Sequence, residues 1–189
     1  PDDGMGYDPI TRGRFNRELD ALRKLSSPHI VRVFDHGKAH DGVIYAVFEQ
    51  VPGRDLSAIL DAEDRLDPPT VEHILRQLLN ALREAHDIGV IHRDLKPENV
   101  RVFRAKGDPW TVKLLDFGIA RPTQQQARVT ATGELVGTPR YMSPEQLLAK
   151  PLDGRSDLYS LGMLTFEMLM GREALYGTSW GEQVERLRA

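Results

Sequence analysis

The sequence predicts an α+β fold in two unequal parts, a small mixed part over residues 1–50 and a larger, mostly helical part over residues 51–189. Three patterns support this division. Apolar residues recur at helical spacing at about 11–25, and two short runs of strand-like composition follow them. Further along, a one-sided apolar pattern at 69–86 and a nearly all-apolar run at 156–170 indicate long, buried helices.

The small part begins with turn-forming residues at 1–10, which have no periodicity and predict a loop. The helix that follows should end before Pro28, because the residue before a proline is pushed out of the helical region. The two apolar runs at 30–34 and 43–48 predict antiparallel strands joined by a turn that contains Gly42.

The larger part begins with a short helix that Asp55 should cap and that reaches Asp61. The helix at 69–86 has a proline pair at its first turn, and Gly89 closes it. Polar, aperiodic residues at 119–142 predict a long loop, and loops of this length are usually functional. The remaining predicted elements are strand-like pieces at 90–91, 100–103 and 112–115 and helices at 144–149 and 156–170.

Charge, cysteine content and hydropathy exclude several classes of protein. The 25 basic and 28 acidic residues give a formal net charge of −3, whereas nucleic-acid and membrane-surface proteins usually carry a basic excess. The chain has no cysteine, which excludes disulfides and thiolate metal sites and fits a reducing, cytoplasmic location. The longest apolar-rich stretch, 158–170, contains Glu167 and is shorter than the roughly 20 residues that span a bilayer, so we expect no membrane segment in this chain.

One short segment gathers the side chains that phosphoryl transfer requires. The sequence HRDLKPEN at 92–99 places a carboxylate at Asp94, an ammonium at Lys96 and a side-chain amide at Asn99. Transfer of a phosphoryl group from ATP to a hydroxyl needs a base near the hydroxyl, a cation near the phosphate and an oxygen ligand for Mg²⁺. Asp116, in an Asp-Phe-Gly turn, adds a second hard oxygen, and it and Asn99 together suit Mg²⁺.

With the sequence GTPRYMSPE at 137–145, these motifs resemble the protein kinase superfamily, and the resemblance extends over about 11–172. It implies a kinase-like two-lobe fold, ATP and Mg²⁺ as cofactors, and hydroxyl groups of proteins as substrates. The roles that it implies are the catalytic base for Asp94, a contact to the γ-phosphate for Lys96, and Mg²⁺ binding for Asn99 and Asp116.

Two positions resemble Ser/Thr kinases rather than tyrosine kinases. They are Lys96, two residues after the base, and Thr138, which precedes a Pro-x-Tyr sequence and completes the implied catalytic set. Thr130 and Thr132 are similar to the paired threonines that bacterial kinases of this type autophosphorylate, with a second copy of the chain as partner. In such kinases a loop phosphate neutralises the arginine beside the base, here Arg93. The alternative is that both threonines are ordinary solvated loop residues.

The resemblance also assigns residues around the nucleotide. Glu18 aligns with the glutamate that pairs with an ATP-binding lysine, the alternative being an ordinary surface glutamate. Phe48 takes the gatekeeper position, and the backbone of Glu49 and Val51 would bond the adenine. Arg101 stands beneath the adenine, where the family usually has an aliphatic residue. We expect its stem to pack there while its guanidinium reaches solvent.

Other implied positions are structural. Asp157 resembles the buried aspartate that anchors the backbone of the catalytic loop, and without such donors a carboxylate in that apolar helix would be costly. A stacked column of side chains, typical of active kinases, is implied for Leu22, Val33, His92 and Phe117.

The resemblance fails at the phosphate-binding end. No Gly-rich loop and no partner lysine precede Glu18, so we expect that the chain starts just after those strands and stops, near Ala189, before the last helices of the family. The small sheet should then be a stub that leaves Val31 and Val47 poorly covered. Two functions stay open: a Ser/Thr kinase whose 189-residue chain is inactive alone, and a truncated, non-catalytic module that binds partner proteins.

Overall fold

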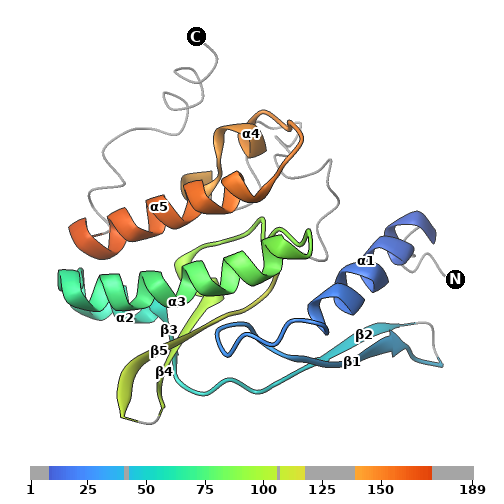
Figure 1. Ribbon diagram of the computed structural model, residues 1–189, viewed down its shortest axis with the longest axis horizontal. Helices are drawn as coiled ribbons and strands as arrows, with labels where there is room; N and C mark the ends of the chain where they lie inside the picture. Colours follow the sequence, from blue (N-terminus) through green and yellow to red (C-terminus); the bar gives the residue numbers. More distant parts are fainter. Residues whose placement is uncertain (1–8, 41–42, 106, 118–138, 172–189) are drawn as a thin grey trace, which may run out of the picture.

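The computed structural model describes residues 9–40, 43–105, 107–117 and 139–171 (Figure 1). Its smaller group of elements is α1 (Pro9–Leu22), β1 (Val33–Lys38) and β2 (Ile44–Phe48). The predicted first helix is therefore present, but it ends earlier than expected, at Leu22. After Leu22, backbone hydrogen bonds between residues three apart replace the α-helical bonds between residues four apart, as in the 3.1 Å bond from Leu25 N to Leu22 O.

The two strands of this group form an antiparallel hairpin, as predicted. Val33 lies opposite Phe48 at one end and Lys38 opposite Ile44 at the other, with an irregularity in register just after Val33. α1 lies against this hairpin, and Leu19 of α1 is fully buried (Figure 1). The small sheet that the described residues form thus has two strands, in agreement with the expected stub.

A three-stranded antiparallel sheet, in the order β3-β4-β5, and the remaining helices form the larger group. α3 packs against β5 on one side and against α5 on the other (Figure 1). The elements are β3 (Arg54–Asp55), α2 (Leu56–Glu63), α3 (Pro68–Asp87), the 3-10 turn η1 (Pro97–Asn99), β4 (Val100–Ala105), β5 (Asp108–Leu114), the 3-10 turn η2 (Pro139–Tyr141), α4 (Pro144–Leu147) and α5 (Gly154–Met170). The boundary drawn at residue 50 stays a prediction.

Local sequence explains where α3 begins and ends. The carboxylate of Asp67 accepts a hydrogen bond from Thr70 N at 3.1 Å, and hydrogen bonds from the side chain and the backbone of Thr70 lower the pKa of Asp67 below its ordinary value. Pro68 and Pro69 occupy the first turn, where a missing N–H has no cost. Gly89 follows the helix at φ 76°, a conformation that favours glycine.

The apolar run at 30–34 does not form one strand, which corrects the prediction. Its first half joins the larger group instead: Leu114 N donates to His29 O and Val31 N donates to Leu114 O, both at 2.9 Å. Ile30 forms a parallel bridge with Leu114. The strand of the hairpin begins only at Val33, because the preceding backbone groups already bond to the end of β5.

This attachment also decides which residues of the small group are covered. Val31, which we expected to be poorly covered, is buried, because it packs beside the end of β5. Val47 is 44% exposed, as expected for a residue of a two-stranded sheet. The strand-like pair at 90–91 forms no strand in the described part of the chain.

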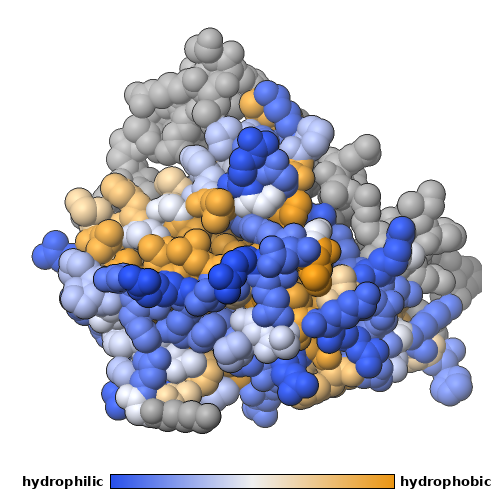
Figure 2. Space-filling model, in the orientation of Figure 1, coloured by the Kyte–Doolittle hydropathy of each residue, from blue (hydrophilic) through white to orange (hydrophobic). Residues whose placement is uncertain are grey.

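α5 is less buried than its composition suggested. Leu161, Leu164 and Met168 face the core, whereas Tyr159 and Phe166 are about two-fifths exposed among the described residues. α5 packs on α3 along one face, so apolar residues elsewhere on the helix are left at the surface. Figure 2 shows apolar residues gathered over α3 and α5. In the described ranges, no helix combines the length and apolarity needed to cross a bilayer.

Candidate active site

A buried carboxylate fixes the backbone at the start of the catalytic loop. Asp157 of α5 is almost fully buried, and its two oxygens accept hydrogen bonds from His92 N at 2.8 Å and Arg93 N at 2.9 Å. His86 Nε2, from the last turn of α3, donates to the same carboxylate at 2.7 Å. These three donors offset the cost of burying the charge. The anchoring role predicted for Asp157 is confirmed.

The loop brings Asp94, Lys96 and Asn99 together. Lys96 Nζ lies 3.2 Å from Asp94 Oδ2, and Asn99 Nδ2 donates to Asp94 O at 2.7 Å and to Asp94 Oδ2 at 3.1 Å. Because both bonds of Asn99 use its amide nitrogen, its oxygen Oδ1 is the atom suited to a cation. The turn η1 holds this arrangement, since Asn99 N donates to Lys96 O at 3.0 Å.

The end of β5 carries Asp116 to the same loop. Leu115 N donates to Asn99 O at 2.9 Å, which ties the residue before Asp116 to the catalytic loop. Asp116 is exposed and has φ 43°, and Arg93 has φ 66°, so two residues of the site adopt a backbone conformation that is uncommon outside glycine. An amide oxygen at Asn99 and a carboxylate at Asp116 are donors that fit Mg²⁺, which takes few protein ligands and completes its shell with phosphate and water.

His92 and Phe117 link the catalytic loop to the core. Their ring centroids are 4.6 Å apart; Phe117 belongs to the same buried core as Leu22 and Val33, and His92 is fully buried beside it. Burial lowers the pKa of His92, partly opposed by the nearby Asp157 carboxylate, so the ring is neutral at physiological pH. Its Nε2 then donates to Leu115 O at 2.8 Å and its Nδ1 accepts from Asp94 N at 3.3 Å, so the ring contacts the backbone of Asp94 and of the residue before Asp116.

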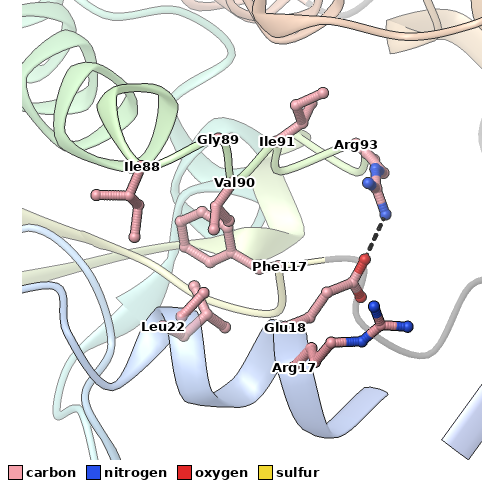
Figure 3. A pocket seen from close by; sticks show the side chains of 10 residues that line it. Arg17, Glu18, Leu22, Ile88, Gly89, Val90, Ile91, Arg93 and Phe117 are labelled. Atoms are coloured by element: carbon pink, nitrogen blue, oxygen red, sulfur yellow. Dashed lines mark hydrogen bonds and ion pairs between the residues drawn. The ribbon is translucent and has the colours of Figure 1, made fainter. Parts of the chain in front are cut away.

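Glu18 of α1 has a different partner from the predicted lysine. Its Oε1 accepts a hydrogen bond from Arg93 Nη1 at 2.9 Å, and both side chains are mostly buried (Figure 3). The pair connects α1 directly to the residue before Asp94. No local pattern in the sequence indicates this pair, because its members are 75 residues apart.

The segment after β2 holds the residues predicted to contact adenine. Phe48 ends β2, and the backbone N–H of Glu49 donates to Arg32 O at 2.9 Å, so this N–H is already engaged and is not the group that would make the predicted bond to adenine. The carboxylate of Glu49 accepts from Arg32 N at 2.9 Å and forms an ion pair with Lys113 of β5. Lys113, which sequence reasoning missed, thereby ties the segment between the two sheets to the strand that leads to Asp116.

The guanidinium of Arg101 of β4 has a partner at the surface that the sequence did not indicate. Its Nη1 lies 3.1 Å from Asp55 Oδ1 and 3.4 Å from Gly53 O, and its Nε is buried without a hydrogen-bond partner among the described residues. The pairing of β3 with β4 sets Asp55 directly opposite Arg101. Asp55 was predicted only as a helix cap, and its side chain makes no capping bond.

The segment before α4 is fastened to the catalytic loop. Ser143 and Gln146 form a reciprocal capping box, and Gln146 Nε2 donates to Arg93 O at 2.8 Å. The Tyr141 hydroxyl donates to the buried carboxylate of Glu167. The three threonines singled out from the sequence, Thr130, Thr132 and Thr138, lie outside the described residues.

The loop at 92–99 presents a carboxylate, an ammonium and an amide, and a buried aspartate holds its backbone. The loop lies between the larger, helical group and the small group of hairpin and helix. This arrangement is typical of the catalytic domain of protein kinases. Residues 7–188 match the family described as "Protein kinase domain", and the chain belongs to the protein kinase family.

Bacterial Ser/Thr kinases are among its relatives. The chain is 44% identical over 167 residues to serine/threonine-protein kinase pkn3 of Myxococcus xanthus, covering 87% of this chain and 30% of that protein. It is 40% identical over 179 residues to the probable serine/threonine-protein kinase PknB of Corynebacterium glutamicum, covering 93% and 27%. The chain thus spans less than a third of the length of these curated relatives.

Crystal structures of the Mycobacterium tuberculosis PknI kinase domain are also similar. A single-mutant form superposes with a TM-score of 0.66 at 29% identity, covering 86% of this chain and 57% of that one. A double-mutant form gives 0.69 at 27% identity, covering 92% and 62%. The kinase-like two-lobe fold predicted from the sequence is confirmed.

Proposed function

We propose that the protein containing this chain transfers the γ-phosphoryl group of ATP to Ser and Thr hydroxyls of protein substrates, with Mg²⁺ as the metal ion. The observation that carries the proposal is the cluster of Asp94, Lys96 and Asn99, with Lys96 Nζ 3.2 Å from Asp94 Oδ2. Its anchoring through Asp157 supports the proposal further, because phosphoryl transfer depends chiefly on positioning and electrostatic stabilisation.

In this proposal Asp94 orients the substrate hydroxyl and takes its proton as the new oxygen–phosphorus bond forms and the bond to the ADP oxygen breaks. Lys96 contacts the transferred phosphoryl group and offsets its charge, and Thr138 bonds to Asp94 or Lys96. Asn99 and Asp116 hold Mg²⁺, which neutralises phosphate charge when bound. Adenine binds the backbone of Glu49 and Val51 over Arg101, with Phe48 behind it, and Glu18 turns from Arg93 to the phosphate side when the nucleotide binds.

The substrate class rests on the relatives and on two residues. Both of the relatives described above are named as Ser/Thr kinases, and Lys96 and Thr138 stand where Ser/Thr kinases have them. A cytoplasmic location of this catalytic part, where ATP is available, belongs to the same proposal.

We propose that regulation works through Thr130 and Thr132, phosphorylated by a second copy of the protein. A phosphate adds nearly two negative charges and three acceptor oxygens, which suits a nearby guanidinium. Arg93 supports this role because it stands beside the base and its Nε is buried without a hydrogen-bond partner among the described residues. We propose a different role for Thr138: its loss should abolish turnover itself and not only the regulation of turnover.

One observation favours a second candidate, a non-catalytic module that binds partner proteins. Glu18 is paired with Arg93 rather than directed toward a nucleotide site. The two candidates differ in nucleotide chemistry: only a kinase consumes ATP in step with the appearance of phosphorylated Ser or Thr.

The test is phosphorylation of a Ser/Thr-containing protein by the purified protein with ATP and Mg²⁺. Asp94→Asn and Asp116→Asn should each lower turnover by orders of magnitude, because they remove the base and a metal ligand. Asp87→Asn makes the same chemical change at an exposed position of α3 and should leave turnover unchanged. Turnover that survives both catalytic substitutions, or product on Tyr alone, would contradict the proposal.

A further inference from the structure

A serine in the connection between α1 and β1 holds that connection against α3 (Figure 1). Ser26 donates two hydrogen bonds to one carboxylate oxygen, Glu84 Oε1. Its backbone N lies 2.6 Å from that oxygen, and its hydroxyl Oγ lies 3.1 Å from it. Glu84 is in α3, 58 residues further along the chain. The pair therefore fastens the small group of elements to the larger one.

The hydroxyl of Ser26 is accessible. Ser26 is exposed, and it lies in a stretch, 25–27, that belongs to no helix or strand. The other serines and threonines whose exposure the structure describes are buried or partly buried. Because no helix or strand has to unfold, this hydroxyl can reach the active site of a second copy of the protein once its bonds to Glu84 open.

A phosphate on Ser26 would change the partner of this residue. The hydroxyl donates to a carboxylate, whereas a phosphate carries nearly two negative charges and accepts hydrogen bonds. Glu84 would repel it, because both groups are anionic. Arg23 and Lys24, which are exposed and precede Ser26 at the end of α1, would attract it. The hydroxyl form thus favours contact with α3, and the phosphorylated form favours separation from it.

We propose that Ser26 is a phosphorylation site of this protein and that its phosphate detaches the small group from α3. This inference rests on the proposed kinase function, with a second copy as the enzyme and ATP as the phosphate donor. Ser26 Oγ forms the new bond to the γ-phosphorus, the bond to the ADP oxygen breaks, and the hydroxyl proton passes to Asp94 of the second copy. The detached connection directly follows α1, so the phosphate acts on the helix that carries Glu18 to Arg93.

The first test is phosphosite mapping by mass spectrometry, after the purified protein has been incubated with ATP, Mg²⁺ and a Ser/Thr-containing protein. We expect phosphate on Ser26 and none on the adjacent Ser27, which is buried and whose Oγ accepts a hydrogen bond from His29 N at 3.2 Å. Ser26→Ala should remove the phosphate from the peptide that contains both serines.

Two negative results of this test differ in meaning. A protein that phosphorylates the added substrate but leaves Ser26 unmodified would overturn this inference, and the kinase function would stand. Absence of phosphate from the added substrate and from the chain itself would end both proposals.

The second test measures release from α3 without ATP or turnover, by amide hydrogen exchange at residue 26. Ser26→Asp places a carboxylate beside Glu84 and should speed this exchange at least about tenfold, because the N–H loses a charged acceptor. Ser26→Asn is the neutral control of the same shape and should speed it less. Glu84→Gln removes the repelling charge but keeps an accepting oxygen, so Ser26→Asp added to it should change the rate by no more than about twofold.

Equal exchange rates in Ser26→Asp and Ser26→Asn would overturn the proposed release. An effect of Ser26→Asp that is the same with and without Glu84→Gln would also overturn it, because repulsion by Glu84 would then not be the cause. Thermal unfolding confirms that each variant is folded.

Discussion

Replacing Asp157 with Asn tests whether one buried carboxylate holds the catalytic loop. The substitution keeps the shape of the side chain, but it replaces one accepting oxygen with an NH₂ group that faces a backbone N–H of His92 or Arg93. One hydrogen bond to a charged acceptor, about 1.5–3 kcal/mol, is lost, and a buried donor is left without a partner, which costs about 1–3 kcal/mol. Allowing for relaxation around the site, we expect the free energy of unfolding to fall by about 3 kcal/mol.

The assay is urea unfolding followed by circular dichroism, with turnover measured on the same preparations. Glu72→Gln is the matched control, because it also converts a carboxylate to an amide, but in an exposed pair with Arg76. That pair contributes no more than about 0.5 kcal/mol. If Asp157→Asn unfolds within about 0.5 kcal/mol of the natural protein, the carboxylate does not anchor the loop and the reasoning fails.

Three further outcomes are expected. The hydrogen bond from Arg155 lowers the pKa of Asp153 from 3.8 to about 2. The ionised Asp153 therefore contributes fully to stability above about pH 4, and this contribution is lost as the pH falls through 2. Asp153→Asn should flatten this acid dependence of the free energy of unfolding, measured across pH. Gly53→Ala should lower the free energy of unfolding, measured in urea, by at least about 3 kcal/mol, because φ is 93° and a Cβ would lie 2.0 Å from a carbonyl oxygen of β4. The control is Gly89→Ala, at a position with φ 76° and open space, which should lower it by only about 1 kcal/mol. Thr130→Ala/Thr132→Ala should lower turnover severalfold and remove the phosphates that mass spectrometry maps to this loop, and full activity in that double variant would refute the proposed regulation.

The features that the sequence predicted well depend on neighbouring residues. The proline pair and the cap at Asp67 fix the start of α3 within one residue of the predicted position. The spacing within residues 92–99 was enough to predict that Asp94 and Asn99 lie together, because η1 is a local turn that joins them. Family resemblance supplied the anchoring role of Asp157, which composition alone would not have shown.

What the sequence could not predict depends on residues far apart in the chain. Glu49 pairs with Lys113, 64 residues later, and no local pattern distinguishes that lysine from a solvated one. The same holds for Arg101, whose strand pairing with Asp55 decides where its guanidinium goes. Phe166 is exposed because it lies outside the face of α5 that packs on α3. The apolar composition of α5 does not reveal which of its faces makes that contact.

The attachment of residues 29–31 to the end of β5 has a mechanical consequence. Two backbone hydrogen bonds to Leu114 hold the chain there, close to the C-terminal end of α1 and far from its N-terminal end (Figure 1). Because α1 is held near its C-terminal end, a shift of the group formed by α1, β1 and β2 would rotate the helix about that end. The largest displacement would then be at the N-terminal end of α1. Glu18 lies on the moving arm and Leu22 near the pivot, so such a swing separates Glu18 from Arg93 while Leu22 stays packed in the core.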